Sequence, residues 1–219
     1  MDHRLFGLFS GFPNYSFPYN IAERLREEIK YRKSIVFVSA WPDDHKKNDS
    51  DAAGMHDMFK EIDLPFTQFH VIDNRMEFTH SNDLICEASC IFLMGGHPGL
   101  QIKFLQKTGL DNVICKNYSV LLGVSAGAIN MAKNSLDTKE SNIPYKGLGL
   151  VNITVKPHFD IKNQHILSNL LSISMEMNIC AMEDNSAIFI LGDKISNIGK
   201  IHWISQGKIY PFEQGNPLL

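Results

Sequence analysis

Apolar runs rich in β-branched and aromatic residues alternate along the chain with segments of helical spacing. Strands buried in a parallel sheet are apolar on both faces, whereas a surface helix repeats apolar residues every three or four positions. The pattern predicts strands over residues 5–9, 34–40, 66–72, 90–94, 119–124, 150–155 and 186–191. It predicts helices over residues 21–31, 51–62, 82–88, 100–107, 112–117, 126–133 and 163–177.

Strands that alternate with helices are typical of a parallel sheet covered by helices. We therefore expect an α/β fold, in which a three-layer, doubly wound and mostly parallel sheet carries helices on both faces. Residues 201–204 and 208–210, on either side of a polar turn, predict a C-terminal β-hairpin. The polar stretches 41–50 and 134–147 are predicted to be loops. We expect one domain over residues 1–212 and a C-terminal tail over 213–219.

Composition and charge narrow the class of partner. The chain has 219 residues, of which 44% are hydrophobic, and a formal net charge of only -3. This charge gives no strong field that would attract nucleic acid or an anionic membrane. The first residues lack the pattern of a secretory signal, and the four cysteines lack the spacing of a disulfide framework. We expect a cytoplasmic protein that binds neither nucleic acid nor a membrane.

The segment Gly123-Val124-Ser125-Ala126-Gly127 fits the G-x-S-x-G pattern. It lies between a predicted buried strand and a predicted helix, which is the context of a nucleophile elbow. The sharp turn needs glycine at its flanks and exposes the serine hydroxyl above the sheet. The sequence therefore predicts Ser125 as a catalytic nucleophile.

A serine hydroxyl needs a base to take its proton, and imidazole suits this role because its pKa lies near neutrality. Nine histidines are available, and His158 has the most suggestive position. It follows directly on a predicted strand, and ligands of open α/β sheets bind at the carboxyl ends of strands. We expect His158 to be the base.

A carboxylate usually holds such a histidine in the right tautomer. Glu183 precedes a predicted strand and could reach the same edge of the sheet. Asp160 is close in sequence but is expected to point away, and Asp137 and Glu140 lie in the polar connection after residue 133. The residues alone leave these four carboxylates open.

The oxyanion of acyl transfer needs hydrogen-bond donors, which backbone N–H groups can supply. Ala126 follows the nucleophile directly, and its N–H is the first expected donor. Gly96, in the pair Gly95-Gly96 at the end of a predicted strand, is the expected second donor because glycine allows close approach of the backbone.

Four segments of the chain together resemble the peptidase E family of serine peptidases, known as S51. They are Met94-Gly95-Gly96, Gly123-Val124-Ser125-Ala126-Gly127, Lys156-Pro157-His158-Phe159 and Met182-Glu183-Asp184. The resemblance implies a fold like the class I glutamine amidotransferases and a catalytic triad of Ser125, His158 and Glu183. It also implies a metal-free exopeptidase, without cofactor, that releases an N-terminal residue, typically aspartate, from dipeptides or short peptides. Members of the family are often homodimers.

The chain departs from the family in the expected lining of the site, for which we select Gly95, His97, Asp160 and Lys162. His97 stands where the family commonly has asparagine. The family's aspartyl specificity depends on an arginine beyond the catalytic histidine, whereas this chain has no arginine after Arg75. Lys162 offers a point charge there but lacks the bidentate fork of a guanidinium. We therefore expect weak or absent selectivity for N-terminal aspartate.

The residues and the resemblance together predict a serine protease of the exopeptidase type, a hydrolase that cleaves dipeptides or short peptides, and so acts as a dipeptidase, through an acyl-enzyme on Ser125. A cyanophycinase-like enzyme, or another serine hydrolase on the same fold, is the nearest alternative. A binding module that keeps the fold without catalysis is the alternative from another class.

Overall fold

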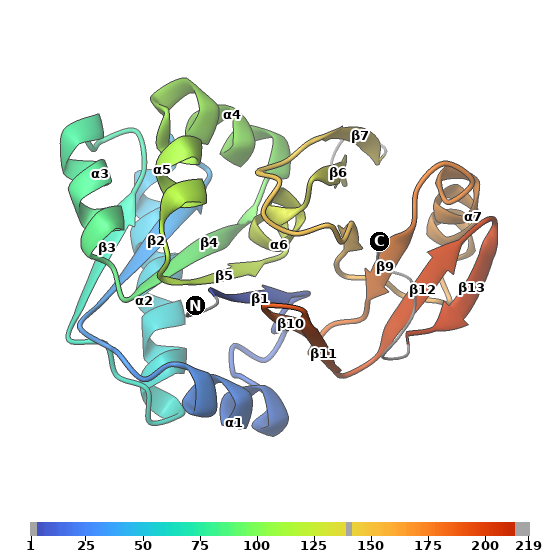
Figure 1. The fold of residues 1–219 in the computed structure, drawn as a ribbon, viewed down its shortest axis with the longest axis horizontal. Coiled ribbons are helices and arrows are strands. Elements are labelled where there is room, and N and C mark those ends of the chain that lie inside the picture. Colours follow the sequence, from blue (N-terminus) through green and yellow to red (C-terminus); the bar gives the residue numbers. More distant parts are fainter. Residues whose placement is uncertain (1–3, 139–141, 213–219) are drawn as a thin grey trace.

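The computed structural model describes residues 4–138 and 142–212. A large sheet lies between two layers of helices, and a smaller sheet with one helix lies at one end of it (Figure 1). The strands of the large sheet are β1 (Leu5–Phe9), β2 (Ser34–Ala40), β3 (Gln68–Ile72), β4 (Cys90–Gly96), β5 (Val120–Val124), β10 (Ala187–Leu191) and β11 (Lys194–Ile198). Their order across the sheet is β11-β10-β1-β5-β4-β2-β3.

The large sheet is mostly parallel, as the sequence predicts. Parallel pairs join β1 to β5, β5 to β4, β4 to β2 and β2 to β3. Only β10 and β11 run antiparallel to their neighbours, at one edge of the sheet. The chain order of the parallel strands reverses around β1 and β5, so the loops after these two strands diverge and leave room for a site.

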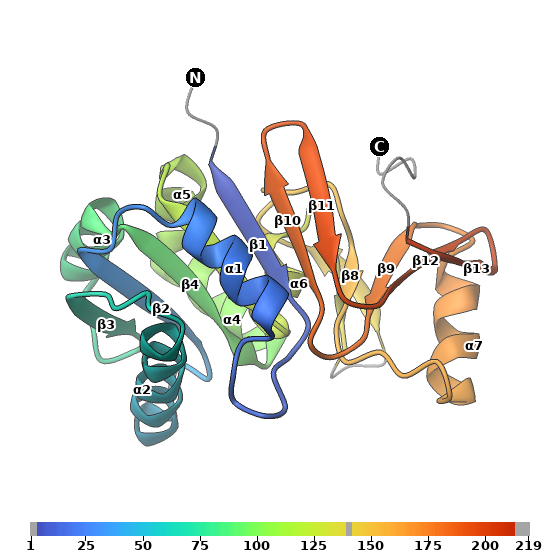
Figure 2. The ribbon, with the colours of Figure 1, turned by 90° about the horizontal axis from the view of Figure 1, so that it is seen from below.

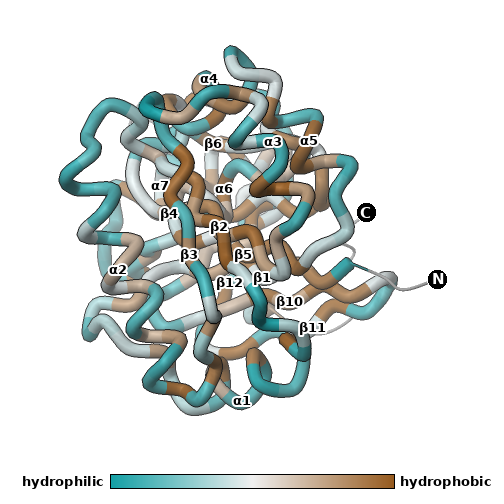
Figure 3. The backbone as a smooth tube through the Cα atoms, turned by 90° about the vertical axis from the view of Figure 1, so that its left-hand side faces the viewer, coloured by the Kyte–Doolittle hydropathy of each residue, from teal (hydrophilic) through white to brown (hydrophobic). Residues whose placement is uncertain are grey.

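Helices cover both faces of the large sheet. The helices are α1 (Tyr19–Glu28), α2 (His45–Glu61), α3 (Phe78–Glu87), α4 (Pro98–Thr108), α5 (Leu110–Lys116), α6 (Ala126–Met131) and α7 (Gln164–Ile173). The first two pack with Phe9, Phe37 and Phe92 on one face, and the next four pack on the other. Figure 2 shows α1 and α2 together on one side of the strands. Figure 3 shows the hydrophobic strands enclosed by more hydrophilic outer segments.

The smaller sheet has four strands in the order β13-β12-β9-β8. They are β8 (Val155–Lys156), β9 (Ile179–Met182), β12 (Ile201–Ser205) and β13 (Lys208–Pro211). The predicted C-terminal hairpin is confirmed as β12 and β13. It pairs with β9 rather than with the large sheet, and α7 packs against its apolar face.

Several local predictions were wrong. Residues 41–50 are not all loop, because α2 already begins at His45, with the Asp44 side chain accepting from the Lys47 N–H. The stretch 134–147 holds a hairpin, β6 (Asn134–Asp137) and β7 (Ile143–Lys146). β9 and β11 were missed, and the strand predicted over 150–155 is reduced to β8 at its end.

Two predictions concern the ends and the surroundings of the chain. The predicted tail, residues 213–219, lies outside the described residues. Within residues 4–138 and 142–212, no helix has the length and apolar character needed to cross a membrane.

Candidate active site

Ser125 occupies a sharp turn between β5 and α6. Its backbone has φ 51° and ψ -109°, a conformation that side-chain-bearing residues rarely adopt and that concentrates at functional sites. A Cβ added at Gly123 would lie 2.7 Å from the Gly127 carbonyl carbon, and one at Gly127 would lie 2.0 Å from the Leu93 oxygen. Both flanking glycines are therefore required by close packing. This is the elbow that the sequence predicts, with the Ser125 side chain partly exposed.

Three side chains form a continuous hydrogen-bonded chain. His158 Nε2 lies 2.9 Å from Ser125 Oγ, and His158 Nδ1 lies 2.7 Å from Asp184 Oδ1. A carboxylate only accepts hydrogen bonds, so Nδ1 carries the proton and Nε2 is left to accept one from the Ser125 hydroxyl. The arrangement matches the nucleophile, base and orienting carboxylate of a serine hydrolase.

The turn that follows β1 holds His158 and Asp184 in place. Ser10 is fully buried, accepts a hydrogen bond from the His158 backbone N–H at 2.8 Å and donates one to the Met182 carbonyl at 2.9 Å. Its hydroxyl also lies 3.5 Å from Asp184 Oδ1. A Cβ on Gly11 would lie 2.4 Å from His158 Cε1, so only glycine leaves room for the ring. Sequence reasoning missed both residues, although Ser10-Gly11 directly follows a predicted strand.

The prediction that Glu183 orients His158 was wrong, because the Glu183 side chain contacts a different histidine. Glu183 Oε1 lies 2.9 Å from His202 Nε2, on the strand β12 of the smaller sheet. The backbone N–H of Glu183 donates to the Lys200 carbonyl, so this residue still follows the smaller sheet. Asp184, one residue later, turns toward the large sheet and takes the place expected for Glu183.

Of the three other carboxylates left open by the sequence, the two that the structure describes make contacts elsewhere. The Asp160 carboxylate accepts a hydrogen bond from the Lys162 backbone N–H. Asp137 lies beside Gly99 at the start of α4. Glu140 lies outside the described residues.

The glycine pair at the end of β4 lies next to the elbow. A Cβ on Gly95 would lie 3.6 Å from Ser125 Cβ, which places this backbone beside the candidate nucleophile. Gly96 has φ 144°, and a Cβ there would lie 2.5 Å from Trp41 Nε1. The glycine thus lets the indole of Trp41 pack against the strand end. The role of Gly96 and Ala126 as oxyanion donors stays a prediction.

The structure places the remaining expected binding residues less centrally. His97 precedes α4 and accepts from the Leu100 N–H, and its ring meets the edge of Trp41 at 5.7 Å between centroids. His97 therefore supports Trp41. Asp160 and Lys162 are exposed, and within the described part of the chain no hydrogen bond joins the Lys162 ammonium to another group.

Comparisons with known proteins agree with this geometry. The sequence profile of peptidase family S51 matches residues 9–198. The chain belongs to peptidase family S51. No curated protein matches this S51 chain significantly.

Two solved structures share the fold of this S51 member. A peptidase from an acI-B1 Actinobacterium superimposes with a TM-score of 0.75 and 15% sequence identity, over 98% of this chain and 96% of that one. A protein described as a peptidase E, from Listeria monocytogenes EGD-e, gives a TM-score of 0.67 at 17% identity, over 90% of this chain and 98% of that one. Family and fold together support a peptidase, which is a hydrolase.

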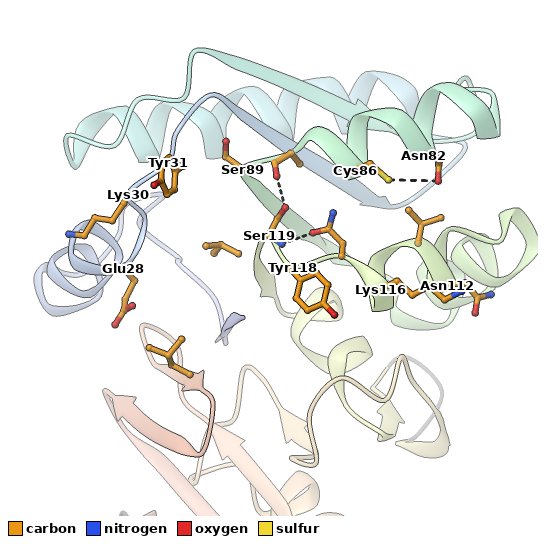
Figure 4. Close-up of a pocket in the computed structure, with 15 residues that line it drawn as sticks. Glu28, Lys30, Tyr31, Asn82, Cys86, Ser89, Asn112, Lys116, Tyr118 and Ser119 are labelled. Carbon is orange, nitrogen blue, oxygen red and sulfur yellow. Dashed lines mark hydrogen bonds between the residues drawn. The ribbon is translucent and has the colours of Figure 1, made fainter. Parts of the chain in front are cut away.

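One large hollow of the S51 chain lies away from Ser125. It has a volume of about 1230 Å³ and is lined by Ser89, Ser119 and Val120, at the amino ends of β4 and β5. Figure 4 shows it with exposed Tyr31 and Tyr118 at its sides. Ser125 follows the opposite, carboxyl end of β5, so this hollow takes no part in the chemistry at the elbow.

A smaller pocket, of about 600 Å³, adjoins the elbow. Gly95, Gly96 and Val124 contribute to its wall, and Val124 is the residue before Ser125. Further walls come from Trp41 and from α2. Sequence reasoning missed this pocket because its lining comes from loops and a helix that are distant in sequence.

The cysteines divide into two exposed and two buried thiols. Burial raises the pKa of Cys90 and of Cys180 far above the usual range, which keeps both thiols neutral. Cys86 and Cys115 are exposed. Among the described residues, no group of three or more His, Cys, Asp and Glu side chains gathers as a metal site would require.

Proposed function

We propose that this chain is a serine exopeptidase that hydrolyses dipeptides or short peptides through an acyl-enzyme on Ser125. The observation that carries the proposal is the hydrogen-bonded chain from Ser125 through His158 to Asp184, with distances of 2.9 and 2.7 Å. Release of a single N-terminal residue follows from the likeness to peptidase E.

In the first half of the reaction, His158 Nε2 takes the proton of the Ser125 hydroxyl while Oγ attacks the scissile carbonyl carbon. Asp184 accepts the Nδ1–H bond and stabilises the imidazolium that forms. The negative charge on the carbonyl oxygen is met by the N–H groups of Ala126 and Gly96. His158 then gives its proton to the amine nitrogen as the C–N bond breaks.

In the second half, water replaces the departed amine. His158 takes a proton from this water as its oxygen attacks the ester carbonyl of the acyl-enzyme. When the C–Oγ bond breaks, the proton returns to Ser125 Oγ and the N-terminal residue leaves as a free amino acid. The enzyme is then restored without any redox step.

The test is Ser125→Ala, assayed on a library of dipeptides. We expect a loss of kcat of at least about 10³-fold, because the attacking atom is removed while the fold stays intact. Ser168→Ala is the matched control, since Ser168 is an exposed serine on α7. Wild-type turnover in the Ser125 variant would refute the proposal.

A fluorophosphonate probe tests activation of the hydroxyl without any assumption about substrate. The probe is expected to label the wild type at Ser125 and to leave Ser125→Ala unlabelled. A binding module without catalysis would leave Ser125 unlabelled in the wild type as well, because an unactivated serine is a weak nucleophile.

A further inference from the structure

We propose that the 600 Å³ pocket beside Ser125 binds the side chain of the substrate's N-terminal residue, and that a large apolar side chain is preferred there. The inference rests on the proposed function and adds the substrate class. It also places selectivity in α2 and the loop before it, rather than in the segment after His158.

The order of strands in the large sheet fixes which side of Ser125 the acyl group occupies. His158 and Asp184 reach Ser125 from the side of β1 and β10, over the turn at Ser10. The pocket lies mainly on the opposite side, between α2 and the ends of β4 and β5, and the loop after β1 adds Phe12 and Tyr15 to its wall. His158 must lie within hydrogen-bond reach of the leaving amine to protonate it. The acyl residue, on the other side of the scissile bond, is therefore directed toward the pocket.

The lining of the pocket is predominantly apolar. Its apolar and aromatic residues are Phe12, Tyr15, Trp41, Met55, Met58, Phe92, Met94 and Val124. Phe92, Met94 and Met58 are buried in the core that α1 and α2 make with the sheet, so they form a firm base. Methionine side chains adapt to apolar groups of different shapes. Such a surface favours side chains such as leucine, methionine or phenylalanine.

The charges of the pocket cancel. Lys47 Nζ lies 2.8 Å from Asp51 Oδ2, one helical turn away on α2, and both residues line the pocket. Lys47 is the only lysine or arginine in this lining, as far as the described residues show. A substrate carboxylate would have to take Lys47 from Asp51 and would then face the Asp51 carboxylate at close range.

The five arginines of the chain are engaged elsewhere. Arg75, the last of them, bridges Asp49 and Asp73. Arg4 donates to carbonyls at Ser119 and Ile114, near the amino end of β5. Arg24 pairs with Glu28, whereas Arg26 and Arg32 donate to the carbonyls of Ile62 and Asp63. The bidentate fork that would select aspartate is therefore missing from this pocket.

The size of the preference follows from the area that a side chain buries. Full burial of a leucine, methionine or phenylalanine side chain corresponds to a gain of about 10- to 100-fold in kcat/KM over alanine. Aspartate gains no apolar contact and loses hydration. We expect it to be cleaved at least about 10-fold more slowly than methionine.

The experiment compares Xaa-Leu dipeptides in which Xaa is alanine, methionine, phenylalanine, aspartate or lysine, with fluorophosphonate labelling run in parallel. The expected order of kcat/KM places methionine and phenylalanine first and aspartate well below them. Fastest cleavage of Asp-Leu by a labelled enzyme would overturn the pocket inference alone. Absence of both labelling and cleavage would overturn the proposed function and this inference with it.

A substitution in the pocket tests its location. Met55→Arg places a guanidinium in the apolar lining, and we expect the ratio of Asp-Leu to Met-Leu cleavage to rise at least about 10-fold. Met175→Arg, the same change at an exposed methionine beyond α7, is the matched control and should leave the ratio unchanged. An unchanged ratio in Met55→Arg would overturn the inference.

A second variant guards against misfolding of the first. A Cβ at Gly54 meets no atom within 4 Å, so Gly54→Leu fits on α2 without strain and narrows the pocket from that helix. It should lower kcat/KM for Phe-Leu relative to Ala-Leu at least about 5-fold, because a narrower pocket buries less of the Phe side chain. Full burial of that side chain would raise kcat/KM by at most about 100-fold. Equal effects on the two peptides would count against the pocket as the binding site.

Discussion

Replacing Asp184 by asparagine tests whether the contact seen at His158 controls the reaction. The Asp184 carboxylate accepts the Nδ1–H of His158 at 2.7 Å, which leaves Nε2 free to take the Ser125 proton. An asparagine amide can instead donate to Nδ1. The ring then carries its proton on Nε2 and cannot act as a base toward Ser125.

The expected loss follows from this change of tautomer and from the exposure of the pair. In a fully buried triad the corresponding change lowers kcat by about 10⁴-fold. Here the Asp184 side chain is 40% exposed, so water can accept the Nδ1–H bond and restore part of the useful tautomer. We therefore expect kcat to fall by about 10²- to 10³-fold, equivalent to about 2.7 to 4 kcal/mol of transition-state stabilisation.

The assay is the steady-state hydrolysis of the best dipeptide substrate, with Glu183→Gln as the matched control at the neighbouring position. Glu183 contacts His202 rather than His158. The kcat of Glu183→Gln should therefore stay within about 3-fold of the wild-type value. A larger loss in Glu183→Gln than in Asp184→Asn would refute this reasoning. It would restore the triad that the family resemblance implies.

Two further predictions concern the turn after β1. Ser10→Ala leaves the His158 N–H without its buried acceptor, whereas the Met182 carbonyl keeps the hydrogen bond from the Phe159 N–H. Urea unfolding should therefore show a loss of about 1 to 3 kcal/mol in the free energy of unfolding. Its kcat should also fall, and unchanged stability would contradict the hydrogen-bond argument. Gly11→Ala brings a methyl group within 2.4 Å of His158 Cε1 unless the ring moves. The rate of fluorophosphonate labelling at Ser125 should fall at least about 10-fold, which corresponds to a rise of about 1.4 kcal/mol in the activation free energy. Labelling at the wild-type rate would show that the His158 ring does not need the space beside Gly11.

Much of the fold was predictable because the spacing of apolar residues within a short segment indicates whether that segment forms a strand or a helix. β1 and β2 have the predicted bounds, and five parallel strands of the large sheet lie within or near their predicted ranges. Short strands such as β6 and β9 were missed because four residues are too few to show a period. β9 was hidden for a further reason, since its apolar residues follow directly on a predicted helix.

The candidate nucleophile and its base were also predictable from local sequence. Two glycines flank Ser125 because the elbow is tightly packed, and His158 follows closely on β8, although this strand belongs to the smaller sheet rather than to the sheet of β5. In both cases the pattern that allows the prediction lies in residues that are close together in the chain.

The choice of carboxylate and the shape of the pocket were decided only by tertiary structure. Glu183 and Asp184 are adjacent, at the place where the chain leaves β9 and turns toward β10. Which of them faces His158 depends on how the smaller sheet docks beside the larger one, and no local pattern records that docking. The pocket likewise joins Trp41, Lys47 and Val124 from separate parts of the chain. Local sequence fixes which groups each element offers, whereas packing between elements decides which of those groups meet.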